Sequence, residues 1–129
     1  MTDVPRRTRI FVEDKEMIAI FEWINFHQHI RDYAIHIPNE GKRTLSQNVR
    51  LKKMGLKKGV SDIFIAIPNN NYYGLWIEHK SMRANGKFGK ATEEQIEFVR
   101  IMNKIGYFAK ITYGIDDAIN TIRSYLSMP

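Results

Sequence analysis

The stretch "DIFIAIPNNNYYGLWIEHKS", Asp62–Ser81, decides the fold. Two apolar runs flank a segment rich in proline and asparagine, which predicts an antiparallel hairpin closed by a turn. Both runs are apolar enough to lie in the middle of a sheet. Asp62 opens the first strand, whereas Glu78 and Lys80 close the second. Because residues two apart on a strand share a face, we expect these three charges to meet at one end of the sheet.

Helix and strand patterns alternate on both sides of the hairpin. Thr92 and Gln95 form a capping box that opens one helix, and Thr44 or Ser46 caps a shorter one that Gly55 ends. The predicted elements are helices at 13–28, 44–55, 92–106 and 116–126, and strands at 33–37, 61–67, 73–80 and 107–113. This order predicts a single α/β domain, residues 1–129, with a mixed β-sheet flanked by helices.

Length and composition set limits on the class of protein. A chain of 129 residues suits one domain with one core. No apolar run approaches the roughly 20 residues that span a bilayer, so we expect no membrane anchor. The chain has no cysteine, which excludes disulfides and thiolate nucleophiles. No apolar region of the signal-peptide type follows the basic start "MTDVPRRTR", which favours a cytoplasmic protein.

The chain is basic, and part of its charge is concentrated. Lysine and arginine number 20 against 14 acidic residues, which gives a net charge of +6. The segment 41–59 is rich in lysine and arginine and contains no acid, so it can neutralise phosphates along a nucleic-acid backbone. Charge alone does not separate nucleic acid from an anionic membrane. The residues expected to contact phosphate are Lys42, Arg43, Arg50, Lys52 and Lys53, with Lys87 in a later basic loop.

Two carboxylates held close together need a proton or a cation between them. Asp62 and Glu78 would offer hard oxygen ligands, which suit Mg²⁺ or Mn²⁺. Lys80 beside them could contact a phosphate or orient a water molecule, and this set suits metal-assisted hydrolysis of a phosphodiester. The alternative is that Glu78 and Lys80 are a solvated pair on a strand and that Asp62 only caps a turn.

Several segments together resemble the VRR-NUC family of the PD-(D/E)xK nucleases, in its compact stand-alone form from bacteriophage and bacteria. The segments are "VEDKEMIAIFEWI", "IPNEGKR", "KKGVSDIFIAIP", "YYGLWIEHKS" and "ATEEQIEFVRIMNKIGY". They follow the family's order over nearly the whole chain, with Ser61 where the family has proline. The resemblance implies a restriction-endonuclease-like fold and, for a phage protein, the cytoplasm of a bacterial host.

The resemblance also implies roles for individual residues. Asp62 and Glu78 would be the principal metal ligands, the backbone carbonyl of His79 would add a third, and the His79 side chain would matter less. Lys80 would be the catalytic lysine. Gln95 would orient the site or the DNA in addition to capping its helix.

The first predicted helix contributes one further expected ligand. Glu13 falls at the family's first-helix glutamate and would support the metal directly or through water. Asp14 and Glu16 lie close by and are its rivals for this role.

The resemblance implies a metal-dependent endonuclease specific for DNA structure. Stand-alone members resemble Holliday-junction resolvases that work as homodimers, so this reading leads. The alternatives are a flap or restriction-like endonuclease, and a non-catalytic DNA-binding module that keeps the fold. The closing helix and the hairpin tip carry apolar residues that a dimer could bury.

Overall fold

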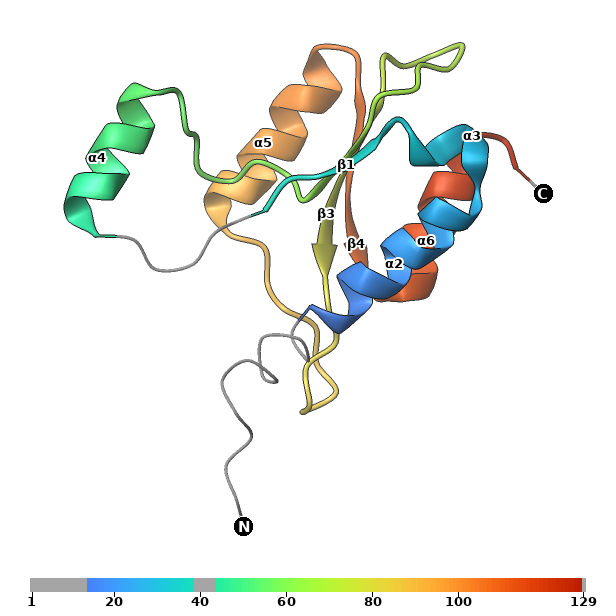
Figure 1. Ribbon diagram of the computed structural model, residues 1–129, viewed down its shortest axis with the longest axis horizontal. Coiled ribbons are helices and arrows are strands. Elements are labelled where there is room, and N and C mark those ends of the chain that lie inside the picture. The colour runs from blue at the N-terminus through green and yellow to red at the C-terminus, as the bar shows by residue number, and fades with distance from the viewer. Residues whose placement is uncertain (1–13, 39–43, 129) are drawn as a thin grey trace.

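A mixed β-sheet lies at the centre of the molecule (Figure 1). The computed structural model describes residues 14–38 and 44–128, and within them the sheet has four strands in the order β1-β2-β3-β4. The strands are β1 (Ala34–His36), β2 (Ile63–Ile65), β3 (Leu75–Lys80) and β4 (Phe108–Tyr113). β2 pairs antiparallel with both β1 and β3, whereas β4 runs parallel to β3. The predicted hairpin, its central position and the α/β architecture are confirmed.

The helices follow the predicted order with one interruption. They are α2 (Lys15–Phe26), α3 (Gln28–Arg31), α4 (Leu45–Lys53), α5 (Glu93–Lys104) and α6 (Ile115–Tyr125). The first predicted helix was expected to continue to Gln28, but His27 adopts an extended conformation with φ −106° and ψ 97°. Its Nδ1 lies 2.8 Å from the carbonyl oxygen of Trp23. This side-chain contact competes with continued helical bonding at that carbonyl, and a separate turn, α3, follows.

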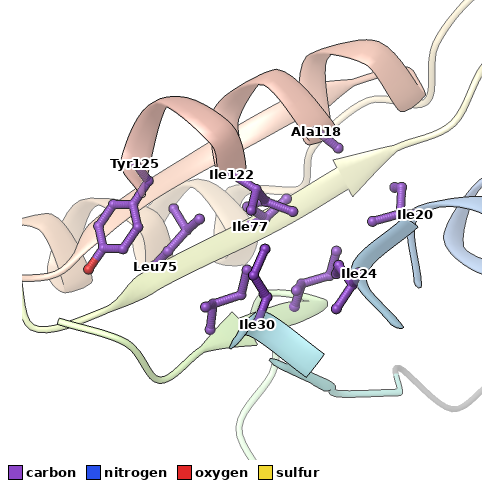
Figure 2. Packing of buried hydrophobic residues seen from close by; sticks show 10 residues of the cluster. Ile20, Ile24, Ile30, Leu75, Ile77, Ala118, Ile122 and Tyr125 are labelled. Atoms are coloured by element: carbon purple, nitrogen blue, oxygen red, sulfur yellow. The ribbon is translucent and has the colours of Figure 1, made fainter. Parts of the chain in front are cut away.

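The main hydrophobic core lies between the sheet and the helix pair α2 and α6 (Figure 2). Ile20 and Ile24 of α2, Ile77 of β3 and Ile122 of α6 are all fully buried. Burial of one such side chain stabilises the fold by about 1.5–3 kcal/mol. The core therefore fixes the orientation of β3, the strand that carries the predicted catalytic residues.

The opposite face of the sheet packs against α5. Trp76 of β3 stacks on Phe64 of β2 with ring centroids 4.3 Å apart, and it meets Phe98 of α5 edge-on at 5.1 Å. Since side chains alternate along a strand, Glu78 and Lys80 share this face with Trp76. The alternation thus directs both charged groups towards α5 and away from the main core.

The outer edge of β4 is covered by side chains. Asn103 of α5 accepts a hydrogen bond from the backbone N–H of Ala109 at 2.8 Å and donates one to the carbonyl of the same residue at 2.9 Å. Near the end of the strand, Asp117 of α6 accepts the backbone N–H of Tyr113 at 2.9 Å. Two helices therefore satisfy backbone groups that an edge strand otherwise leaves open.

The helix α4 stands apart from the sheet (Figure 1), and none of its residues is buried. Thr44, one of the two predicted caps, opens it in a capping box with Gln47, and Gly55 follows its end with φ +99°. Its basic side chains are accompanied by exposed apolar ones, since Leu45 is 81% and Met54 74% exposed.

The closing helix is not the free apolar surface that the sequence suggested. Ala118, Ile122 and Tyr125 of α6 are buried in the core, and Tyr72 of the hairpin tip contacts Tyr125. Only Tyr73 at that tip is largely exposed, at 69%. Along 14–38 and 44–128, the helices are too short or too polar to cross a membrane.

Candidate active site

Asp62 and Glu78 lie opposite each other on neighbouring strands. The pairing of Ile63 with Ile77 places the preceding Asp62 across from Glu78, as expected for the predicted hairpin. The two carboxyl groups lie close enough for the charge of Asp62 to raise the pKa of Glu78. The backbone N–H of His79 donates to Asp62 Oδ2 at 2.9 Å and holds that carboxylate against the end of β3.

The surroundings of Glu78 disfavour its ionised form. The residue is only 2% exposed, and its Oε1 has no hydrogen-bond partner among the described residues. Burial, and then the charge of Asp62, raise the pKa of Glu78 from 4.5 to about 8, although Lys80 opposes the shift. A cation placed between the two carboxylates would remove this penalty.

Lys80 is held between an acid and an amide. Its Nζ donates to Gln95 Oε1 at 2.8 Å and lies 3.4 Å from Glu78 Oε2. The side chain is 13% exposed, so the ammonium has a fixed surrounding with limited access to solvent. The structure therefore brings together the four predicted side chains: Asp62, Glu78, Lys80 and Gln95.

The N-terminus of α5 positions Gln95. Its Oε1 accepts the backbone N–H of Thr92 at 2.9 Å while it also accepts from Lys80, so the capping box and the contact to the ammonium coexist. Gly59 packs directly on this helix end. A Cβ at that position would come within 2.4 Å of the backbone of Glu94, so only glycine permits the approach. The loop leading to Asp62 and the helix carrying Gln95 are thus in direct contact.

The side chain of His79 points to the face opposite Glu78. Its Nδ1 lies 2.7 Å from Thr112 Oγ1, and its Nε2 lies 2.9 Å from Glu16 Oε1. The other oxygen of Glu16 accepts the backbone N–H of Met82 at 3.0 Å. The His79 side chain therefore has a structural role that the sequence did not indicate, because it links the start of α2 to the end of β3.

Both carboxylate oxygens of Glu16 therefore have partners away from Asp62 and Glu78, namely His79 and the amide of Met82. Asp14 is an exposed residue at the start of α2, and Glu13 lies outside the described residues. The sequence missed the contact between Glu16 and His79 because the two residues are 63 positions apart. The one available signal was an unusual histidine between Glu78 and Lys80 on a strand that is otherwise apolar.

The donor set fits a hard divalent cation. Asp62 and Glu78 offer carboxylate oxygens, one of them buried without a partner, and such ligands suit Mg²⁺ or Mn²⁺. No group of three or more acidic or histidine side chains that could hold a metal occurs in the described part of the chain. Backbone carbonyls and water would have to complete the coordination, which is usual for Mg²⁺.

The whole fold has a solved counterpart. A structure described as "VRR_NUC domain protein" superposes with a TM-score of 0.76 and 29% identity, over 90% of this chain and 88% of the other. The chain is therefore similar to a VRR-NUC domain protein over nearly its whole length. The fold is accordingly that of a nuclease-type domain. No protein-family model matches this chain, and no curated protein does.

The predicted phosphate-binding residues that the structure describes lie on two separate segments of the chain. Arg50, Lys52 and Lys53 lie on α4, whereas Lys87 lies in the hairpin 81–91 beyond β3. Figure 1 shows these two segments on different sides of the α5 N-terminus. Lys42 and Arg43 lie outside the described residues.

Proposed function

We propose that this chain is a metal-dependent, structure-specific DNA endonuclease that hydrolyses phosphodiester bonds. The observation that carries the proposal is the cluster of Asp62, Glu78, Lys80 and Gln95 within a VRR-NUC fold. Two adjacent carboxylates with a fixed ammonium are suited to phosphate chemistry, and the basic α4 is suited to a polyanion.

Asp62 and Glu78 would hold Mg²⁺ or Mn²⁺, with the carbonyl of His79 as a further ligand. The bound ion would supply Lewis-acid polarisation of the scissile phosphate and of a water molecule. Hydrolysis joins the water oxygen to phosphorus and breaks one ester bond to a sugar oxygen. That oxygen leaves with a proton, and the second proton of the water passes to solvent.

Lys80 would take one of two roles in this scheme. Its ammonium would contact a non-bridging phosphate oxygen as negative charge accumulates there, or orient the attacking water. Gln95 keeps the ammonium in position, because its Oε1 is itself fixed by the backbone of Thr92. An ammonium already oriented in this way need not be reorganised during the reaction.

The leading substrate is a four-way DNA junction cut by a homodimer. One chain carries a single set of Asp62, Glu78 and Lys80. Two symmetric incisions near a crossover therefore require two copies, and a two-fold dimer is the least elaborate arrangement. Flap or restriction-like cleavage remains the alternative activity, and a non-catalytic DNA-binding module is the alternative outside the enzymes.

A cleavage assay on plasmid, flap and four-way junction DNA separates these functions. We expect incision of branched DNA in Mg²⁺ or Mn²⁺ and none in EDTA. Incision of flaps alone would favour the first alternative. Binding without incision in either metal would favour the module, and full activity after exhaustive chelation would overturn the metal-dependent mechanism.

A further inference from the structure

An exposed aromatic residue stands beside the candidate catalytic lysine. The parallel register pairs Lys80 with Tyr113, so their side chains project from the same face of adjacent strands. Neighbouring strands lie about 4.8 Å apart, which places the tyrosine ring next to the ammonium stem. Tyr113 is 45% exposed, although its backbone is fixed by the hydrogen bond to Asp117.

A second aromatic ring reaches the same place from the hairpin 81–91. Met82 pairs with Phe88 across this hairpin, and the backbone N–H of Arg83 donates to the carbonyl of Lys87 at 2.8 Å. The ring of Phe88 lies 5.6 Å from that of Tyr113, with an interplanar angle of 68°. Figure 1 shows the hairpin extending past the C-terminal end of β3.

The hairpin packs back against Lys80 and against the end of β4. A Cβ on Gly89 would lie 3.6 Å from Lys80 Cδ, and one on Gly114 would lie 3.4 Å from the ring of Phe88. The amide of Gly114 also donates to the carbonyl of Lys80 at 3.1 Å. Phe88 and Tyr113 therefore line the active site itself and are not a remote patch.

The rings are half-exposed within a positively charged segment. Phe88 is 39% exposed, and its hairpin carries Arg83, Lys87 and Lys90 with no acidic residue. Apolar rings that serve only to hold a hairpin are normally covered. Basic side chains that follow a phosphate backbone, interleaved with aromatic rings, are the combination that binds unpaired nucleotides.

We propose that Phe88 and Tyr113 form a stacking site for an unpaired base next to the scissile phosphate. The proposal rests on the proposed function, since it places DNA at Lys80. In a continuous duplex the neighbouring base pairs cover both faces of a base, so the rings have nothing to stack on. At a fork, flap or open junction, a base beside the branch point presents a free face. The stacking site would favour branched DNA without reading its sequence.

Binding of fluorescein-labelled fork DNA in EDTA tests this site without cleavage. The fork is prepared intact and with an abasic residue at each of the first three unpaired positions, and a blunt duplex serves for comparison. For the wild type, we expect one abasic position to weaken binding by about 5-fold or more, the factor that corresponds to roughly 1 kcal/mol per stacked base. The paired variant Phe88→Ala/Tyr113→Ala should bind the intact fork more weakly by a similar factor and show no further loss with the abasic fork.

Two further variants separate stacking from folding. Phe88→Leu keeps an apolar side chain in the hairpin but removes the ring, so it should retain the thermal stability of the wild type and still lose fork preference. Tyr33→Ala removes a 52%-exposed tyrosine at the opposite end of the sheet and should behave as the wild type does.

Each outcome decides one claim. An abasic effect that persists in the paired variant overturns the stacking site, as does an equal loss of fork and duplex binding. Wild-type protein that binds neither DNA overturns the proposed function itself. Loss of fork preference confined to the ring variants, with duplex affinity unchanged, supports the site.

Discussion

Lys80 Nζ lies 2.8 Å from Gln95 Oε1, and that same oxygen also accepts the N–H of Thr92. A single amide therefore joins the capping of α5 to the placement of the candidate catalytic ammonium. The two roles can be separated because α4 has an equivalent capping box, formed by Thr44 and Gln47, that touches no catalytic group.

Gln95→Ala should reduce turnover on saturating DNA, because the Lys80 ammonium loses the acceptor that orients it. Gln47→Ala removes only the corresponding cap interaction on α4, so it should lower stability modestly and leave turnover unchanged. Thermal denaturation and single-turnover rates measure the two effects. Equal turnover losses in both variants would make Gln95 a capping residue only.

Lys80→Ala should keep the fold and DNA binding but lower turnover by about 100-fold or more, a loss typical of groups that stabilise transition-state charge. Lys110→Ala is a matched control, since Lys110 lies on the neighbouring strand and pairs with Asp117 away from the site. The check is single-turnover cleavage beside a binding titration. Wild-type turnover in Lys80→Ala would leave the lysine without a catalytic role.

Glu78 should make the stability of the metal-free protein depend on pH. Its pKa is about 8 in the folded state, against an ordinary 4.5, so between these pH values the folded protein binds the additional proton. The contribution of this group to stability is therefore fully present below about pH 4.5 and is lost as the pH rises through 8. Glu78→Gln should remove this decline and melt at a higher temperature than the wild type at pH 8.

Mg²⁺ or Mn²⁺ should reverse the effect in the wild type. A cation that binds the ionised carboxylate stabilises the folded state, and more so at pH 8 than at a lower pH where Glu78 is protonated. Thermal melts with and without metal at the two pH values provide the measurement. A metal-induced rise of the same size in Glu78→Gln would show that the ion binds elsewhere.

Glu16→Ala should destabilise the protein by about 1–3 kcal/mol, because the buried His79 loses its carboxylate partner. Glu22→Ala, a change at an exposed position on the same helix, controls for the loss of an acid from α2. Chemical denaturation measures both. Equal stabilities of the two variants would show that the contact between Glu16 and His79 contributes little.

Neutralising Arg50, Lys52 and Lys53 together should weaken DNA binding uniformly across sequences and flatten its salt dependence. Each lost phosphate contact lowers the slope of log affinity against log salt by roughly 0.9 on duplex DNA. Lys104→Gln, at the far end of α5, should leave the slope unchanged. An unchanged slope in the triple variant would assign DNA binding to another face.

Much of the site could be predicted because it depends on local patterns. Strand alternation and one turn predict that Asp62 lies beside Glu78. A capping box predicts both the start of α5 and the orientation of Gln95. The break at His27 carried no glycine or proline signal, so the helix was expected to continue. The contact of His79 with Glu16 and Thr112 joins three distant segments, and no periodicity in one segment reports it.

The detached position of α4 and the burial of α6 were also beyond the sequence. Both helices carry apolar residues whose burial cannot be read from the sequence of the helix alone. Only the packing of the whole chain decides which apolar face is covered. Ile122 proves to be core, while Leu45 remains 81% exposed. Helical spacing describes a face but does not say what lies against it.

The side chains of Asn103 and Asp117 along β4 restrict how copies of this protein can assemble. An open edge strand invites another strand to add to the sheet, which is a route to fibrillar aggregation. Asn103 already occupies both backbone groups of Ala109, so an incoming strand would first have to displace it. If two copies pair as proposed, we expect them to meet through side-chain surfaces and not by joining their sheets across β4. The same hydrogen bonds disfavour aggregation through this edge of the sheet.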